Sequence, residues 1–204
     1  MRLRTWTTIL VIVVAGTLVA GAVPPLTADV ANAWEVPVPC DFITSGGFVF
    51  KDDGSRANFG AHGGCKHGAF WGHVNYVDHG GFMPFGFVFT IPYHVDSTEI
   101  TGYLDVPGRP NAREICGFAR TNAGETNIRF RVHLEDNGEG TNATEPDRFG
   151  IRLSNGYLVT TRPLGGGGPG GGNVQLHKGN NSNTGPNPPP DEATMCGDVA
   201  SPGD

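Results

Sequence analysis

Two segments in the second half of the chain alternate apolar and polar residues with the two-residue period of a β-strand. In the first segment the apolar face consists of Ile128, Phe130, Val132 and Leu134, and the polar face of Asn127, Arg129, Arg131 and His133. In the second segment Phe149, Ile151 and Leu153 alternate with Arg148, Gly150 and Arg152. The pattern predicts a long antiparallel hairpin over residues 126–157 with one wet face, followed by a tight turn in which Asn155 and Gly156 supply positive backbone angles.

Further segments have the composition of short strands and are separated by turns rich in glycine, asparagine and aspartate. They are CDFITSGGFVF (40–50), AFWGHVNYVDHG (69–80), FMPFGFVFTIPYHV (82–95), STEITGYLDV (97–106), REICGFAR (113–120), YLVTTR (157–162) and NVQLHK (173–178). Residues 57–68 are too glycine-rich for a helix, and no amphipathic helix of useful length is expected. The sequence therefore predicts an all-β fold, either an antiparallel β-sandwich or a flattened β-barrel, that contains disulfides.

The first 33 residues have the features of an export signal. Arg2 and Arg4 precede an apolar run over residues 9–23, and the small-residue site Ala31-Asn32-Ala33 follows a Pro-Pro break. A membrane-spanning helix needs about 20 apolar residues, so cleavage after residue 33 is favoured over retention as an anchor, and a cut after residue 22 is an alternative. Cleavage changes the net charge from -6 to -7. This predicts a secreted or cell-surface protein and argues against nucleic acid or an anionic membrane as its partner.

The rest of the chain is expected to form a single domain. Residues 34–39, with prolines at alternate positions, predict an extended leader, and residues 40–178 carry the strands. Residues 164–172 predict a flexible glycine loop. Residues 179–204 are rich in proline, asparagine and glycine and predict a flexible tail, unless Cys196 ties that tail to the body.

Four cysteines, Cys40, Cys65, Cys116 and Cys196, follow the export signal. An even number in an exported chain indicates two disulfides, and the sequence leaves all three pairings open. No pair has the CxxC spacing of zinc ligands, so a structural zinc site is not expected.

Several phrases occurring in order resemble the post-COAP domain, a module of secreted and surface-attached bacterial proteins. They are CDFITSGGFVF, ANFG, GHVNYVDHG, STEITGY, LEDNGEG, DRFGIRLSNGY and GGGNVQLHK, and they span residues 40–178. The resemblance implies an extracellular, mostly β accessory domain, and the family supplies no catalytic residues to carry over. The chain departs from the family pattern in its aromatic segment at residues 82–93 and in its longer glycine loop.

The tip of the predicted hairpin is rich in oxygen ligands. Its acids are Glu135, Asp136, Glu139, Glu145 and Asp147, with Asn137 and Asn142 among them. Carboxylate and carbonyl oxygens at this density suit Ca²⁺, and we take Asp136, Asn137, Glu139 and Asp147 as its candidate ligands. A solvated, charged hairpin tip is the alternative.

Two further groups have alternative interpretations. The histidines His62, His67, His73 and His79 lie within 18 residues of one another, but their spacing matches no known ligand set and favours turn and surface histidines. The aromatic residues Trp71, Phe85, Phe87, Phe89 and Tyr93 are candidates for a surface that stacks on sugar rings or covers a partner protein. Burial of these aromatic side chains in the core is the alternative.

No serine lies in a nucleophile motif, and no helix follows the glycine run to bind phosphate. The sequence thus favours a non-catalytic module with a binding or structural role, whose partner is a polysaccharide or another surface protein. One alternative is a carbohydrate-binding protein that uses residues 82–93. A second is an extracellular enzyme, for which two or more of His73, His94, His133, Asp78 and Asp136 would have to meet in one pocket.

Overall fold

The structure is a computed structural model that describes residues 33–84, 86, 88–139, 145–167 and 170–203, so the expected export signal lies outside it except for its last residue. Residues 31–204 form one compact unit. The strands of this unit are β1 (Phe42–Phe50), β2 (Arg56–Lys66), β3 (Ala69–Asp78), β4 (Tyr93–Val106), β5 (Arg109–Thr121), β6 (Ile128–Glu135), β7 (Arg148–Leu153), β8 (Leu158–Pro163) and β9 (Gly172–His177). A 3-10 turn, η3 (Leu164–Gly167), and a short helix, α1 (Glu192–Cys196), complete it.

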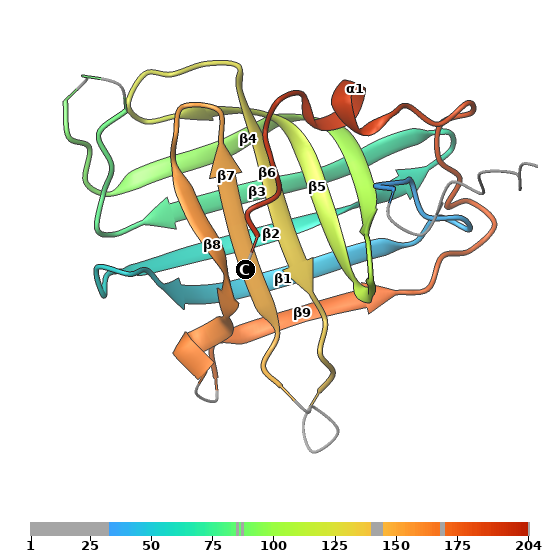
Figure 1. Ribbon diagram of the computed structural model, residues 1–204, viewed down its shortest axis with the longest axis horizontal. Coiled ribbons are helices and arrows are strands. Elements are labelled where there is room, and N and C mark those ends of the chain that lie inside the picture. The colour runs from blue at the N-terminus through green and yellow to red at the C-terminus, as the bar shows by residue number, and fades with distance from the viewer. Residues whose placement is uncertain (1–32, 85, 87, 140–144, 168–169, 204) are drawn as a thin grey trace, which may run out of the picture. The chain divides into compact units, whose positions relative to one another are not determined.

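All nine strands belong to one antiparallel sheet. Its order is β8-β7-β6-β5-β4-β3-β2-β1-β9, so each strand pairs with its neighbour in the chain and β9 returns to the free edge of β1. Figure 1 shows β6, β7 and β8 crossing in front of β1, β2 and β3, because the sheet curls into a half-barrel. The predicted antiparallel all-β fold is confirmed, in the form of a single curled sheet.

The curl presses the inner faces of the two halves of the sheet together. Phe59 of β2 stacks on Phe149 of β7 with their ring centroids 3.9 Å apart. The hydroxyls of Tyr76 in β3 and Tyr157, just before β8, are 2.6 Å apart and form a buried hydrogen bond. Apolar burial supplies most of the stabilising free energy, and the paired hydroxyls avoid the cost of unsatisfied polar groups.

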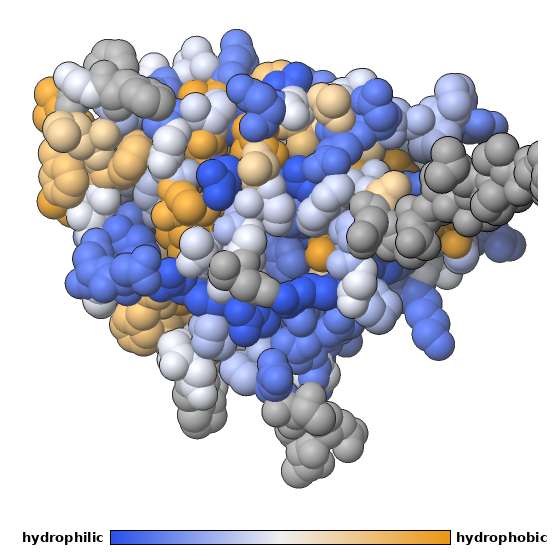
Figure 2. Space-filling view, in the orientation of Figure 1, coloured by the Kyte–Doolittle hydropathy of each residue, from blue (hydrophilic) through white to orange (hydrophobic). Residues whose placement is uncertain are grey.

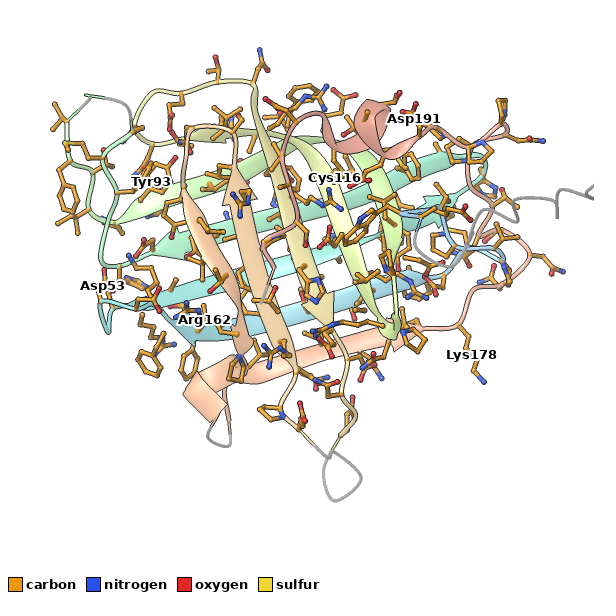
Figure 3. The ribbon with its side chains drawn as sticks, in the orientation of Figure 1. Asp53, Tyr93, Cys116, Arg162, Lys178 and Asp191 are labelled. Atoms are coloured by element: carbon orange, nitrogen blue, oxygen red, sulfur yellow. A yellow bond between two sulfur atoms is a disulfide. The ribbon has the colours of Figure 1, made fainter. Side chains whose placement is uncertain are left out.

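Arg162 of β8 holds one edge of the curled sheet in place. Its guanidinium donates hydrogen bonds to the Phe50 carbonyl at 2.8 Å and to Asp52 Oδ1 at 3.0 Å, both near the β1–β2 turn (Figure 3). Turn η3 then leads from β8 to β9 in the glycine run, and Gly165 and Gly166 there adopt positive φ values of 63° and 71°. The segment that was predicted to be a flexible loop thus includes an ordered turn, because glycine accepts these angles without strain.

The predicted hairpin corresponds to β6 and β7. Val132 lies opposite Ile151 and Leu134 opposite Phe149, and all four side chains are buried in the core. In the following turn only Gly156 has a positive φ, of 89°, so the expectation of a positive angle at Asn155 was wrong.

The other face of this hairpin is not exposed to solvent, so the expectation of a hairpin with one wet face was wrong. Arg131 and His133 are only 2% and 4% exposed, because residues 190–203, the C-terminal strap, cover them. The strap is anchored by the disulfide Cys116–Cys196 and by a 2.6 Å hydrogen bond from the Thr161 amide to the Gly203 carbonyl. The composition of residues 179–204 predicted a flexible tail, but the tie through Cys196 places the described part of it against the sheet.

The second disulfide, Cys40–Cys65, joins the start of the domain to the end of β2. The leader before it forms no strand, yet Val36 is buried against the core and the Glu35 carbonyl accepts a 2.8 Å hydrogen bond from the Asp105 amide. In the part of the chain that the structure describes, no helix has the length and apolar character needed to cross a membrane.

The aromatic segment is where the strand prediction fails. The described residues of the segment 82–92 form one isolated bridge, between Phe82 and Thr90, and β4 begins at Tyr93. Pro84 and Pro92 have no amide hydrogen to donate, so a regular ladder cannot run through this segment. It forms a connection between β3 and β4 instead.

Candidate functional site

The four candidate calcium ligands lie together beside the edge strand β9. The Asp147 carboxylate accepts hydrogen bonds from the amides of Asn137 at 2.8 Å and Val174 at 2.6 Å. The Asp136 carboxylate accepts from the amides of Gly138 at 2.9 Å and Leu176 at 2.8 Å. Two carboxylates therefore bind the edge of β9 directly, where no further strand pairs with it.

The other two candidates also have protein partners. Asn137 Oδ1 accepts from the Asn111 amide group at 2.8 Å, and Glu139 Oε1 accepts from the Asn173 amide group at 3.1 Å. Among the described residues, no three histidine, cysteine or acidic side chains are close enough to hold a metal ion as they stand. The geometry gives these oxygens a role in joining the β6–β7 loop to β9, and calcium binding stays a prediction.

We expect Asp147→Ala to lower the free energy of unfolding by about 2–4 kcal/mol, because it leaves the buried amide of Val174 and the partly buried amide of Asn137 without an acceptor. Asp147 is 6% exposed, and burial, followed by the charges of Asp136 and Glu139, raises its pKa. Urea denaturation with and without Ca²⁺ measures the effect, and Glu139→Ala, which removes one exposed contact, serves as the control. A loss of stability seen only in Ca²⁺ would show that the carboxylate acts through the ion instead.

The five candidate aromatic residues do not form one surface. Tyr93 is buried on the inner face, where its ring lies 5.4 Å from that of Tyr157. Trp71 lies on the outer face of β3, with its ring 6.0 Å from that of Phe42. Phe89 is 52% exposed in the β3–β4 connection, and Phe85 and Phe87 lie outside the described residues.

The β3–β4 connection nevertheless exposes apolar side chains. Met83, Val88 and Ile91 are 55%, 84% and 61% exposed. Figure 2 shows apolar residues gathered at the end of the molecule where this connection lies.

The outer face of β9, β1, β2, β3 and β4 is open to solvent and carries three rows of side chains, each row crossing the strands in register. We call them the aromatic row, the imidazole row and the glycine row. The aromatic row consists of His177, Phe42, Gly64 and Trp71. The imidazole row consists of Gln175, Thr44, His62 and His73. The glycine row consists of Asn173, Gly46, Gly60, Asn75, Asp96 and Arg120.

The glycine row forms an open floor on this face. A methyl group built on Gly60 would meet no atom within 4 Å, and one on Gly46 would meet only the Phe59 carbonyl oxygen, at 3.8 Å. Neither glycine has a positive φ, so the backbone does not require glycine at these two positions. The absence of side chains leaves the backbone accessible to a ligand.

Polar and aromatic groups border this floor. At one end, Asp96 and Arg120 form an ion pair at 2.8 Å and line an open pocket of about 390 Å³ together with Asn75, His94 and Asn122. Along the side, the rings of Phe42 and His177 stack with centroids 4.4 Å apart. This outer face is the candidate functional site, since it combines a flat backbone floor, hydrogen-bonding side chains and ring faces.

Sequence reasoning missed most of this site. Of its residues, only Trp71, His62, His73 and His94 had been singled out: Trp71 with the aromatic candidates, His62 and His73 with the histidine group, and His73 and His94 with the residues considered for catalysis. The available signal was the two-residue period, which places Phe42, Thr44 and Gly46 on one face of their strand. The neighbours across the sheet become visible only when the strand register is known.

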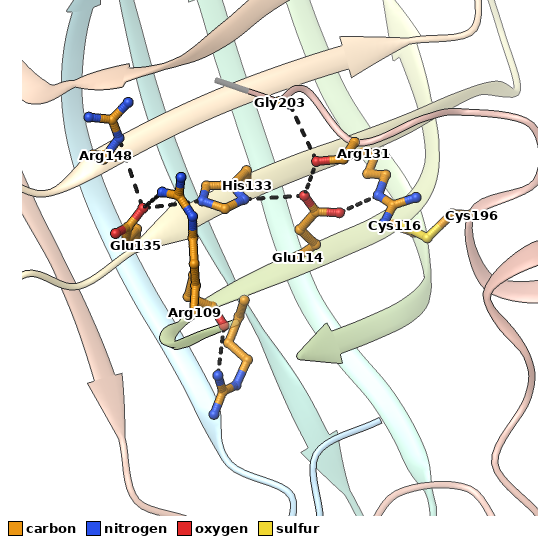
Figure 4. A network of polar contacts seen from close by, with 12 residues as sticks. Arg109, Glu114, Cys116, Arg131, His133, Glu135, Arg148, Cys196 and Gly203 are labelled. Carbon is orange, nitrogen blue, oxygen red and sulfur yellow. Dashed lines mark hydrogen bonds and ion pairs between the residues drawn. A yellow bond between two sulfur atoms is a disulfide. The ribbon is translucent and has the colours of Figure 1, made fainter. Parts of the chain in front are cut away.

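The outer face of the other half of the sheet carries a buried polar network under the strap (Figure 4). Glu114 is fully buried and binds Arg131 through one carboxylate oxygen. Its other oxygen accepts from Ser201 at 2.6 Å and lies 3.2 Å from His133 Nδ1. Glu135 lies on the far side of His133, 3.6 Å from Nε2. The strap shields this network from solvent, so the network stabilises the fold and is not part of an accessible surface.

His133 should make stability depend on pH. Burial lowers its pKa, but hydrogen bonds and charges from Glu114 and Glu135 together outweigh burial and raise the pKa above 6.5. A histidine with a raised pKa in the folded state stabilises the protein fully below about pH 6.5, and this contribution is lost as the pH rises through the folded-state pKa. We expect the stability difference between the wild type and His133→Gln to shrink as the pH rises above about 6.5. Urea titrations across this range test it, and a difference that grows with pH would contradict it.

The positions of the groups considered for catalysis give no support to an active site. The pocket beside His94 contains none of His73, His133, Asp78 or Asp136. The cavity beside His133, of about 150 Å³, likewise contains no second member of that set. Asp78 is fully buried, where it accepts a hydrogen bond from Tyr157 and pairs with Lys51 at 2.8 Å.

Another pocket has a volume of about 760 Å³. It lies between the leader and the segment after β9, and its walls include Val36, Pro39, Asn183 and Pro186. No ionisable side chain lines it, so it offers no acid, base or nucleophile.

A comparison with protein-family models finds no match, and searches of curated proteins and of solved structures find none either.

Proposed function

We propose that this chain is an exported, non-catalytic binding module that holds a carbohydrate chain across the outer face of β9, β1, β2, β3 and β4. The observation that carries the proposal is the glycine row. Its bare backbone at Gly46 and Gly60 gives a flat ligand room to lie between the imidazole row and the next row of the face, in which Phe48 of β1 lies opposite Asn58 of β2.

The chemistry of the face favours an uncharged, hydroxyl-rich ligand. Asp96 and Arg120 neutralise each other and still offer several donors and acceptors for hydroxyl groups. Asn75 and Asn173 add amides at exposed positions of the same row. Burial and the neighbouring charge of His73 lower the pKa of His62, which keeps its imidazole neutral at pH 7. Phe42 and Trp71 supply the apolar surface that the C–H face of a sugar ring needs.

Two features support the extracellular setting of this proposal. All four cysteines are paired, and disulfides persist in oxidising compartments. The expected export signal and the resemblance to the post-COAP domain agree with a secreted or surface-attached module, and both stay predictions.

Retention on insoluble polysaccharides, followed by a glycan array, tests the proposal. Gly60→Leu places a side chain on the floor where space is free, so the protein should fold while retention falls at least tenfold. Gly60→Ala is the matched control, because a single methyl group should leave more binding than leucine does. Equal retention of the wild type and Gly60→Leu would exclude this face as the binding surface.

The aromatic segment is a second candidate surface, favoured by the exposure of Phe89 and Ile91. An apolar loop of this kind suits another surface protein as well as a sugar. Phe89→Ala in the same retention assay separates the two surfaces. Loss of binding in this variant but not in Gly60→Leu would assign the ligand to the loop.

A further inference from the structure

The imidazole row places two histidines on adjacent strands directly opposite each other. His62 of β2 pairs in register with His73 of β3, and their ring centroids are 6.3 Å apart. Residues opposite each other in an antiparallel pair have Cβ atoms about 4.5–5.5 Å apart, so both imidazoles can turn toward a common point. A ring bound through nitrogen at about 2.0–2.1 Å has its centroid roughly 3 Å from the ion. At the tetrahedral angle two such rings have their centroids roughly 5 Å apart, so at the observed 6.3 Å the His62 ring has to move toward His73 by about 1 Å to share an ion.

A carboxylate from the next strand lies beside this pair. Asp96 Oδ1 is 3.3 Å from His73 Nε2, which is close to the distance between two ligands of one tetrahedral ion with bonds of about 2.0–2.1 Å. Arg120 binds the other oxygen, Oδ2, at 2.8 Å and 3.1 Å, and so leaves Oδ1 available.

The second ring nitrogen of His73 is also held. Nδ1 lies 3.1 Å from the Ser97 hydroxyl, which itself accepts a hydrogen bond from the Val74 amide at 2.8 Å. A hydroxyl that accepts from Nδ1–H leaves the lone pair on Nε2, and this is the arrangement that orients metal-binding histidines. In that tautomer the lone pair faces the Asp96 carboxylate, and a cation between the two removes their repulsion; in the other tautomer Nε2–H donates to Asp96 Oδ1, and the ion takes the place of that proton.

We propose that His62, His73 and Asp96 bind one divalent transition-metal ion of the Zn²⁺ and Cu²⁺ class on the outer face of the sheet. His73 and Asp96 are already spaced as ligands, and the ion forms the site by drawing His62 toward them through rotation of its side chain. His73 and Asp96 have side-chain exposures of 46% and 31%, so an ion from solvent reaches them and water completes the coordination.

The ligand set decides between classes of metal. Two imidazoles and one carboxylate suit zinc and copper, whereas calcium and magnesium require mainly oxygen ligands. The inference goes beyond carbohydrate binding, because it concerns an ion held by two histidines of the imidazole row together with Asp96 of the glycine row.

Calorimetry with Zn²⁺ on the full chain, purified without an affinity tag, tests the site. We expect saturable binding of one ion per chain in the wild type. His62→Gln and His73→Gln should each weaken it at least tenfold. Both residues lie on the solvent side of the sheet, and circular dichroism verifies that the variants fold. His79→Gln is the matched control, because His79 follows β3 directly, is exposed, and contacts only Asn58 through its ring, at 2.9 Å.

Copper gives an independent readout. The electron paramagnetic resonance spectrum of the Cu²⁺ complex should show two coupled imidazole nitrogens in the wild type and one in His62→Gln. Absence of saturable Zn²⁺ binding in the wild type, or equal affinity in His62→Gln, would overturn the proposal. Retention on polysaccharide in the presence of a chelator is measured separately, so failure of the metal site is distinguished from failure of the carbohydrate proposal.

Discussion

Glu114→Gln is expected to lower the free energy of unfolding by about 3–5 kcal/mol, since it removes the central negative charge of a buried network. Arg131 would remain 2% exposed and would keep only its contact with Glu192 as an ion pair. Arg131 also lies opposite Arg152 across the β6–β7 ladder, where two like charges repel each other. The melting temperature should fall by about 10 °C in a domain of this size.

Glu192→Gln is the control for this result. Glu192 contacts the same guanidinium at 2.6 Å, but its side chain is 37% exposed, so solvent screens the pair and the loss should stay below about 1 kcal/mol. Equal losses in the two variants would show that burial does not set the strength of this network. The double variant Glu114→Leu with Arg131→Met should recover part of the stability, because it leaves no buried arginine without its carboxylate, and the remaining loss is assigned to His133 and Ser201, which bind Glu114 in the wild type.

The position of this network shows what a strand pattern predicts and what it leaves out. Alternation in residues 128–153 correctly gave the inner face of β6 and β7, because only apolar side chains can fill the space between the two halves of the sheet. It gave the wrong environment for Arg131 and His133. Arg131 is covered by the ring of Trp34 in the leader, 4.3 Å away, and by Val199 of the strap, while Ser201 of the strap binds Glu114 beside His133. Val199 and Ser201 lie about 70 residues further along the chain, in a segment too polar to predict a packed structure.

The candidate site also depends on contacts between strands that the alternation of residues does not reveal. Period two predicts that Thr44 and His62 lie on strand faces, but which residues face each other depends on register and on the curl of the sheet. The glycines at positions 46 and 60 resemble strand breakers in the sequence, yet β1 and β2 run through them without interruption. Only the strand register, which places Gly46 opposite Gly60, shows that the two glycines form the floor of the site.

Removing the disulfide Cys116–Cys196 with the double variant Cys116→Ala and Cys196→Ala is expected to cost about 4.5 kcal/mol, since the bond closes a loop of 80 residues. The loss should also release the strap. Apart from the cysteine, its described residues bury few apolar side chains, chiefly Met195 and Val199. Differential scanning calorimetry measures the first effect, and limited proteolysis measures the second as new cleavage within residues 190–203.

The variant Cys40→Ala with Cys65→Ala provides the comparison. Its loop is 25 residues, so the expected cost is about 3.5 kcal/mol, and the strap should stay protected from protease because its own anchor is intact. Release of the strap would expose Glu114 to water and weaken its ion pair with Arg131. In the variant without Cys116 and Cys196, Glu114→Gln should therefore lower the free energy of unfolding by less than it does in the wild type. If the loss is as large as in the wild type, the strap stays in place without its disulfide, held by its remaining contacts, among them those of Glu192, Ser201 and the Gly203 carbonyl.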